Sequence, residues 1–266
     1  MTEQMERTVR DVVRSVKLWH IWTRLGLLDL RMRFRRSAVG PGWVFLNLSV
    51  LVMAIGFIYA NLLGQDAHYF IPYLTAGLIL WNYLTNSIVE GGNAFVNCEG
   101  YIKQISLPIY LYVFRFFVSI GTNACISALA FVVVALAYRV RPGFGTLWAI
   151  PGAVILAAAS FSLILILAHL NARFRDVAQL AGVLMQVGFY VTPVLFPASL
   201  LRARGLNAIF DFNPLYHFLE VVRQPLLFAA PASASNYIGS LVSLALLLLI
   251  GLALMSYYGR RIVFAL

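Results

Sequence analysis

Residues 238–258 read Ile-Gly-Ser-Leu-Val-Ser-Leu-Ala-Leu-Leu-Leu-Leu-Ile-Gly-Leu-Ala-Leu-Met-Ser-Tyr-Tyr, from Ile238 to Tyr258, and contain no charged side chain. About 20 apolar residues of helix cross the roughly 30 Å hydrocarbon core of a bilayer, so this stretch predicts a transmembrane helix. Other runs of similar character extend the pattern, and the predicted spans are 43–63, 70–89, 107–138, 147–170, 177–196 and 238–258. The sequence therefore predicts an all-α integral membrane protein with six transmembrane helices.

The composition agrees with lipid as the main solvent. Hydrophobic residues make up 61% of the 266 residues and charged residues only 11%, whereas a soluble domain has about 25% charged residues. So little charge could not cover a surface facing water, and the length suits a single membrane domain over residues 1–266. The formal net charge is +10. Because the basic residues gather in one arm and a few short loops, we expect no nucleic-acid partner.

The lysine and arginine residues are distributed unevenly across the predicted membrane. With the N-terminus inside, fourteen of the twenty occupy inside segments, Arg260 and Arg261 among them, and five occupy outside segments. Basic residues favour cytoplasmic loops, so both termini are predicted to be cytoplasmic. The remaining one, Arg115, lies in a span and is expected to extend to the cytoplasmic interface. The five outside residues are Arg139, Arg141, Arg202, Arg204 and Arg223. Arg139 and Arg141, which share one loop, go against the preference of basic residues for the cytoplasmic side.

Residues 14–36 have the periodicity of an amphipathic helix. Apolar side chains recur at spacings of three and four, and basic side chains occupy the other faces. The sequence Gly40-Pro41-Gly42 then predicts a break before the first span. Such a helix can lie in the headgroup layer of the membrane. It is either a topology anchor or a lever that contacts a cytoplasmic partner.

Segment 197–236 is the least regular part of the chain. Prolines and a glycine divide it, and its apolar piece 215–228 is too short to cross a bilayer. Short apolar pieces of this kind are re-entrant where protein or a water-filled cavity satisfies their backbone. We expect re-entrant helices on the outside, before the last span, with a surface loop as the alternative.

The chain lacks the motifs of the common catalytic classes. Its two lysines, Lys17 and Lys103, do not follow a glycine-rich loop, so no P-loop ATP site is predicted. No metal-ligand spacing or paired carboxylates occur, and the chain is not expected to be an enzyme or to hold a metal or cofactor of its own. Glu90 is the one acidic residue close to membrane depth, which disfavours an ion-coupled pump.

Two further patterns have both an ordinary and a functional interpretation. Aromatic residues are frequent in the spans; they belong either to interfacial belts or to a path on which sugar rings stack, for which the candidates are Tyr59, Trp81, Tyr83 and Tyr190. The short inner loop 91–106 is either a linker or a helix that docks a cytoplasmic subunit.

Four stretches carry a resemblance to a known family. They are RFRRSAVGPGW at 33–43, YLTAGL at 73–78 followed by Trp81, LNARFRDV at 170–177 followed by Thr192 and Pro193, and NPLYH at 213–217 followed by Arg223. Over nearly its whole length the chain resembles the membrane subunit of an ABC-2 type exporter, in the branch that moves lipid-linked polysaccharides. That branch comprises O-antigen, teichoic acid and capsular polysaccharide permeases, and LNARFRD is more similar to the O-antigen permeases than to the capsular ones.

The resemblance implies partners and roles. The permease is expected to be a homodimer in the bacterial cytoplasmic (inner) membrane, surrounded by membrane lipid, each half pairing with a cytoplasmic nucleotide-binding ATPase subunit that binds ATP and Mg²⁺. The resemblance assigns coupling to that ATPase to Glu99, Tyr101 and Lys103. It assigns an extracytoplasmic gate to Pro193, Asn213, Pro214 and His217, and it implies an aromatic-lined path for a lipid-linked polysaccharide between the two halves.

Two other classes of function stay open at this point. A self-sufficient channel or ion-coupled secondary transporter would show buried charge along the spans, of which the sequence offers little. A membrane-embedded enzyme acting on a lipid-linked sugar would need a carboxylate or histidine cluster at one membrane face, and none can be assembled from the sequence.

Overall fold

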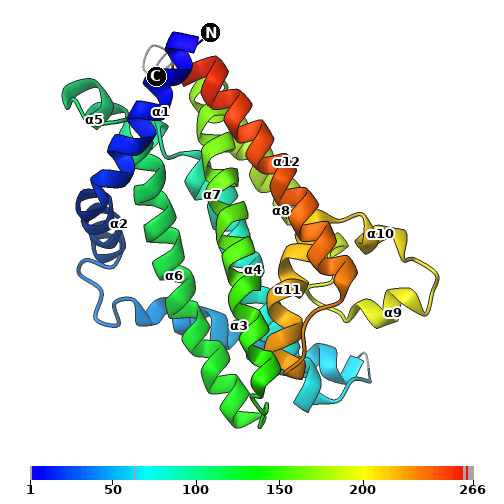
Figure 1. Ribbon diagram of the computed structural model, residues 1–266. Helices are drawn as coiled ribbons and strands as arrows, with labels where there is room; N and C mark the ends of the chain where they lie inside the picture. The colour runs from blue at the N-terminus through cyan, green and yellow to red at the C-terminus, as the bar shows by residue number, and fades with distance from the viewer. Residues whose placement is uncertain (1, 63, 260–261, 263–266) are drawn as a thin grey trace.

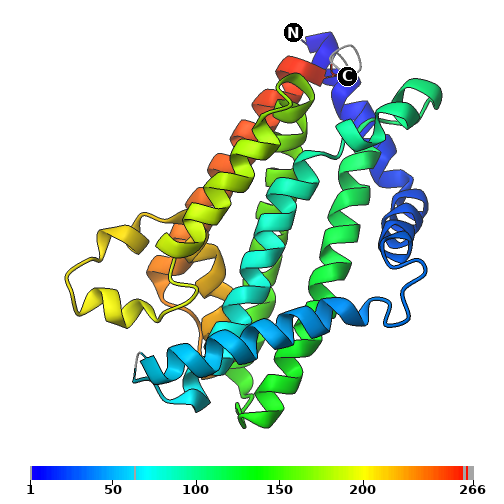
Figure 2. The same cartoon turned by 180° about the vertical axis from the view of Figure 1, so that it is seen from behind.

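The structure, a computed structural model, describes residues 2–62, 64–259 and 262, so Leu63 at the end of the predicted first span and the basic residues Arg260 and Arg261 lie outside it. The described chain is helical and contains no strand. Figures 1 and 2 show the helices as an elongated bundle. In chain order they are α1 Thr2–Lys17, α2 Trp19–Arg33, α3 Gly42–Leu62, α4 Ala67–Gly92, η1 Val96–Cys98, α5 Glu99–Gln104, α6 Tyr110–Ala137, η2 Phe144–Trp148, α7 Ala149–Arg173, α8 Val177–Val191, α9 Ala198–Arg202, α10 Ala208–Asp211, α11 Pro214–Phe228 and α12 Ala234–Tyr258.

Four segments are helical, long and apolar enough to cross a membrane: Gly42–Tyr59, Tyr110–Ala137, Phe144–Arg173 and Ala234–Tyr258. They correspond to four of the six predicted spans. The predicted span 177–196 forms α8, which is 15 residues long, because the helix ends at Val191 before Pro193. The predicted span 70–89 lies in α4, which has 26 residues but carries polar groups such as Asn82, Asn86 and Glu90.

Helix α4 is the central element. It packs against α3, α6, α7, α8 and α11, and its residues from Pro72 to Trp81 are all buried. Protein, rather than lipid, therefore surrounds most of α4, which explains how polar side chains are accommodated on it. In Figures 1 and 2, α4, α6 and α7 run along the bundle, whereas α3 lies across it.

The N-terminal arm is two helices, not the single helix predicted over 14–36. The indole Nε1–H of Trp22 donates to the carbonyl of Ser15 over 3.0 Å, at the end of α1, and the chain turns at Leu18 before α2 begins. This bond satisfies one of the carbonyl groups that a helix end leaves unpaired. Helix α2 packs on α6, where a Cβ on Gly26 would lie 2.6 Å from the carbonyl oxygen of Arg115. The predicted break at 40–42 is confirmed, because α3 begins at Gly42.

The two ends of the bundle differ. One end, here called the arm end, carries α1 and α5; the other, the loop end, carries the connection from α6 to η2 and the start of α4 (Figure 1). Segment 197–236 folds into α9, α10 and α11. Helices α9 and α10 project sideways, while α11 is buried against α7 and α12. A Cβ on Gly152 of α7 would lie 2.1 Å from the carbonyl oxygen of Val221, so only glycine permits this approach of α11.

Candidate transport path, coupling surface and gate

An open groove of about 260 Å³ lies between α3, α4 and α8. Aromatic and amide side chains line it together with apolar ones. The lining residues are Leu51, Leu78, Trp81, Asn82, Thr85, Gly182, Met185, Gln186, Phe189 and Tyr190. Aromatic surfaces with a few well-placed polar groups are typical of sites that bind organic ligands.

The aromatic side chains form one continuous surface in this groove. The ring centroid of Trp81 lies 5.8 Å from that of Phe189, which in turn lies 5.5 Å from that of Tyr190. Trp81 is only 4% exposed and packs at the base, whereas Tyr190 is 64% exposed and projects outward. Gly188 permits this packing, since a Cβ there would lie 3.2 Å from the Trp81 ring.

The structure brings together two of the four predicted path residues, Trp81 and Tyr190. Tyr83 follows Trp81 by two positions and therefore points to another side of α4, where it packs in the core. Tyr59 also packs against the core. Sequence reasoning missed Gln186, although Gly182, Gln186 and Tyr190 recur every four residues and so share one face of α8.

The three predicted coupling residues all lie on α5, which buries none of its side chains. Lys103 donates to the Glu99 carboxylate over 2.7 Å, and this hydrogen bond holds the pKa of Glu99 below its ordinary value. Arg175, from the turn between α7 and α8, lies 3.5 Å from the other oxygen of Glu99. Tyr101 is 54% exposed. The arm end therefore presents a small surface of charged and aromatic groups.

Arg115 connects this surface to the arm. It donates to both carboxylate oxygens of Asp29 on α2 over 2.6 Å. Its guanidinium carbon lies 5.8 Å from the centre of the Tyr101 ring and its Nη1 lies 3.6 Å from the Cys98 sulfur. Burial raises the pKa of the Cys98 thiol to about 11, so the thiol stays protonated at neutral pH. One side chain of α6 thus contacts α2, η1 and α5.

The four predicted gate residues lie in one region at the start of α11. Asn213 caps α11 by accepting from the amides of Leu215 and Tyr216 over 3.0 and 3.4 Å, and its own amide donates to Thr192 over 2.8 Å. Pro214 occupies the first turn, where the missing N–H is harmless. His217 Nε2 lies 2.9 Å from the Asp211 carbonyl oxygen, and Nδ1 lies 3.0 Å from the Asn236 side chain.

A buried ion pair adjoins the predicted gate residues. Arg223 is 0% exposed and donates to Glu220 on its own helix and to the carbonyl of Pro193 over 2.9 Å. Its guanidinium stacks 3.9 Å from the Tyr73 ring, and the Tyr73 hydroxyl donates to the same Pro193 carbonyl over 3.0 Å. From the sequence, Arg223 is expected only as one of the basic residues of the outside segments, without a partner assigned to it. The three-residue spacing from Glu220 on one apolar helix could have indicated the pair.

No group of three or more His, Cys, Asp or Glu side chains in the described part of the chain is arranged to hold a metal ion. The described groups that gather are instead amides, aromatics and isolated ion pairs. Amide and aromatic side chains of this kind are suited to binding an organic ligand.

Known proteins similar to this chain are membrane transport proteins. A family model described as ABC-2 type transporter matches residues 24–227. The O-antigen export system permease protein RfbA of Myxococcus xanthus is 25% identical over 190 residues, which is 70% of this chain and 72% of that protein. A protein of the same name from Klebsiella pneumoniae is 24% identical over 191 residues, with the same coverage. The chain therefore belongs to the ABC-2 type transporter family, as a multi-pass membrane permease that is homologous to O-antigen export permeases.

Proposed function

We propose that this chain is the membrane-spanning subunit of an ATP-driven exporter that moves a lipid-linked polysaccharide out across the bacterial cytoplasmic membrane. O-antigen is the first candidate, because the relatives are named for its export. Two copies of the chain form the path, and a separate ATPase subunit binds ATP and Mg²⁺. The observation that supports the proposal best is the aromatic and amide groove in a chain of this family.

The groove suits a glycan because sugar rings present apolar C–H faces and hydroxyl edges. Aromatic faces such as Tyr190 and Phe189 can stack on the rings, while Asn82 and Gln186 can exchange hydrogen bonds with hydroxyl groups. An open groove that binds each sugar weakly lets a polymer slide. In the dimer we place this groove on the side that faces the second copy.

In this proposal the arm end is cytoplasmic and receives the ATPase. The ATPase contacts Glu99, Tyr101 and Lys103 on α5, together with the arm. Arg115 then passes any displacement of α5 to α2 and α6, because it contacts all three elements or their connections. The cap of α11 and the turn at Pro193 form the outer gate, held by Arg223.

Export in proteoliposomes tests the proposal. The full chain is co-expressed with its cognate ATPase subunit, and ATP-dependent translocation of a lipid-linked O-antigen is measured. Each stacking or hydrogen-bonding contact is worth about 1 kcal/mol, so we expect Tyr190→Ala and Gln186→Ala each to slow export roughly fivefold. Phe144→Ala is the matched control, because Phe144 is 95% exposed and lies outside the groove.

Three results would overturn the proposal. The first is an ATPase subunit that fails to co-purify with the chain. The second is substrate flux that needs no ATPase, which would favour the channel or ion-coupled transporter. The third, equal export by Tyr190→Ala and Phe144→Ala, would remove the groove from the path and leave its aromatics as packing groups.

A further inference from the structure

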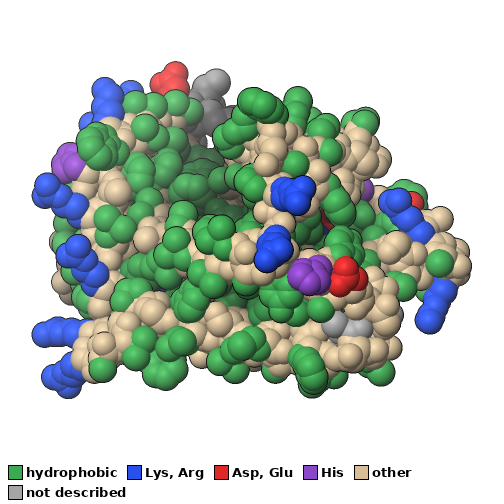
Figure 3. All heavy atoms as spheres, turned by 90° about the horizontal axis from the view of Figure 1, so that it is seen from below, with side chains coloured by type: hydrophobic (Ala, Val, Ile, Leu, Met, Phe, Trp, Pro, Cys, Tyr) green, Lys and Arg blue, Asp and Glu red, His purple; other side chains and the backbone are tan. Residues whose placement is uncertain are grey.

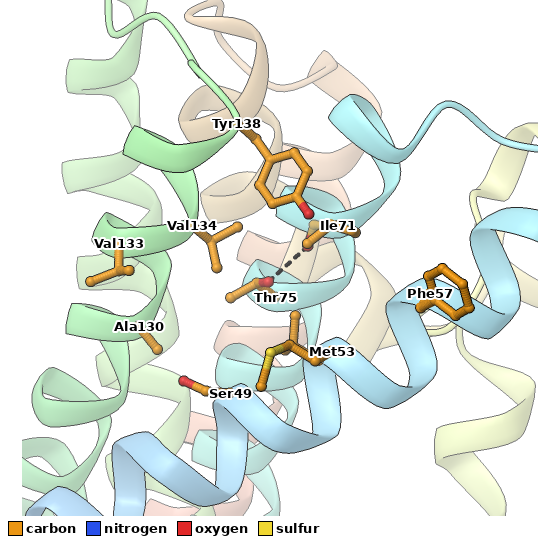
Figure 4. Close-up of a pocket in the computed structure, with 10 residues that line it drawn as sticks. Ser49, Met53, Phe57, Ile71, Thr75, Ala130, Val133, Val134 and Tyr138 are labelled. Atoms are coloured by element: carbon orange, nitrogen blue, oxygen red, sulfur yellow. Dashed lines mark hydrogen bonds between the residues drawn. The ribbon is translucent and has the colours of Figure 1, made fainter.

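A second cavity, of about 380 Å³, lies between α3, α4 and α6 near the loop end (Figure 4). Its lining is almost wholly apolar and comprises Ser49, Val52, Met53, Phe57, Ile71, Thr75, Ala130, Val133, Val134 and Tyr138. The Thr75 hydroxyl is already used, since it donates to the Ile71 carbonyl over 2.7 Å. The cavity belongs neither to the groove nor to the gate.

Water is a poor occupant of this cavity. Its volume equals that of roughly a dozen water molecules, and each would need 2–4 polar partners that this lining does not supply. The rim is apolar as well: Met53, Phe57 and Val133 are each more than half exposed. Because α3 and α6 both contain segments long and apolar enough to cross a membrane, hydrocarbon is the medium that suits these exposed side chains. A flexible apolar chain is the occupant that fits.

Basic groups lie beside the mouth of the cavity. Helix α6 ends at Ala137, the Tyr138 ring lines the cavity, and Arg139 and Arg141 follow as exposed residues. Neither arginine forms an ion pair with another described residue. The His68 ring lies 5.6 Å from that of Tyr138. The space-filling view onto the loop end, in Figure 3, shows two basic side chains, a histidine and an acidic side chain beside that histidine on a largely hydrophobic face.

Arg139 occupies the left-handed position at the end of α6. Arg139 has a φ of 53° and follows the end of α6, where the Val140 amide donates back to the Ala135 carbonyl over 2.8 Å. Helices that end in this way favour glycine at the left-handed position. The same conformation occurs at Ala229, so the backbone places Arg139 at the helix end without assigning it a role. Asp66, two residues before His68, is engaged as the N-cap of α4.

We propose that this cavity binds a phospholipid with an anionic headgroup, from the bilayer leaflet at the loop end. One acyl chain fills the space between α3, α4 and α6, and Arg139 and Arg141 bind the phosphate. Unpaired guanidinium groups at a membrane surface favour an anionic lipid over a zwitterionic one. The lipid fills the space where α3 crosses α4 and α6, which are the helices that α3 packs on, and so holds α3 against the bundle. This site does not depend on what the permease exports.

The test uses the full chain purified in mild detergent, with phosphatidylglycerol or phosphatidylcholine added, and native mass spectrometry to count bound lipid. The charge variant is Arg139→Gln with Arg141→Gln. Its matched control is Arg202→Gln with Arg204→Gln, which removes the same charge away from the cavity. Each basic residue contributes about 1 kcal/mol to binding an anionic lipid, so we expect roughly tenfold or greater loss of phosphatidylglycerol from the charge variant only. A third variant, Val133→Trp, fills the cavity and should displace the lipid while both arginines remain.

Three outcomes would overturn the inference. One is equal retention of phosphatidylglycerol by the charge variant and its control. Another is equal retention of phosphatidylcholine and phosphatidylglycerol by the unchanged chain. The third is displacement of phosphatidylglycerol by an equimolar polyprenyl phosphate, which would assign the site to a cargo carrier. If Val133→Trp fails to fold, the charge variant and its control still decide the matter.

Discussion

Replacing Asp29 with asparagine removes the carboxylate that holds Arg115, and the structure sets the size of the effect. The two side chains are 26% and 15% exposed and are joined by two hydrogen bonds of 2.6 Å. Exposed ion pairs contribute about 0–1 kcal/mol, and loss of one partner of a fully buried pair costs about 3–5 kcal/mol. This pair lies between those limits. We therefore expect Asp29→Asn to weaken the attachment of α2 to α6 by about 2 kcal/mol.

Hydrogen exchange of the α2 amides measures that attachment directly. A loss of about 2 kcal/mol accelerates exchange through local opening by roughly 30-fold, while amides of the buried helix α4 should exchange as before. A double-mutant cycle of Asp29→Asn and Arg115→Gln isolates the pair from other effects of either substitution. The control cycle pairs Arg33→Gln with Glu90→Gln, because that ion pair also involves α2 but its side chains are 44% and 36% exposed. Its coupling should stay below about 1 kcal/mol.

The reasoning fails if the two cycles give the same coupling energy, or if α2 exchanges no faster in Asp29→Asn than in Glu90→Gln. Apolar packing alone, including the close approach at Gly26, would then hold the arm. The functional counterpart uses the complex with the ATPase subunit. In Asp29→Asn we expect ATP hydrolysis to continue while export falls, since the contact that passes motion from α5 to the arm is weakened.

Further predictions concern the other contacts. Gly152→Ala places a Cβ against the α11 backbone and should destabilise the protein by about 1–3 kcal/mol, measured as a lower midpoint of thermal unfolding in detergent; an unchanged midpoint would show that α11 can move away freely. Arg223→Met leaves Glu220 buried and unpaired, which costs about 3–5 kcal/mol, and the double variant with Glu220→Gln should recover part of that loss in the same assay. Reversing both charges, with Glu99→Lys and Lys103→Glu, should uncouple ATP hydrolysis from export with no loss of folding. Normal export by that variant would exclude this loop from coupling.

The sequence predicts the lipid-facing helices well and the protein-facing ones less well. Long uncharged runs such as Ala234–Tyr258 are read directly from composition, because hydrocarbon imposes a simple requirement on them. Helix α4 obeys a different requirement, since neighbouring helices bury it from Pro72 to Trp81, while Asn82 is exposed in the groove and Asn86 is half-buried. The break at Leu18 was missed for a related reason, because it depends on the bond from Trp22 to Ser15 and not on a glycine or proline.

The local structure at the start of α11, where the gate is predicted, follows from residues close together in the sequence. The Asn213 side chain caps the helix and Pro214 fits its first turn, so the start of α11 can be predicted from residues 213–217 alone. Arg223 shows the opposite case. Besides Glu220, Arg223 contacts Tyr73 and Pro193, which are distant in sequence. No spacing along the chain predicts that Arg223 meets these two residues.

Helix α4 connects the sites that the proposed transport cycle must coordinate. Near its end, Glu90 accepts from Arg33 of the arm over 2.6 Å; Trp81 forms the base of the groove; and Tyr73, near its start, contacts Arg223 at the gate. The stretch between Tyr73 and Trp81 is buried throughout and closely packed, and a packed helix transmits displacement without bending. We expect a shift of the arm to reach the proposed gate as a tilt of the whole helix. The groove would then change shape in the same step, because Trp81 lies on α4 and Tyr190 lies on α8. In the proposed cycle, opening of the gate and loosening of the glycan contacts are thus one motion, which is the coordination that export of a long polymer requires.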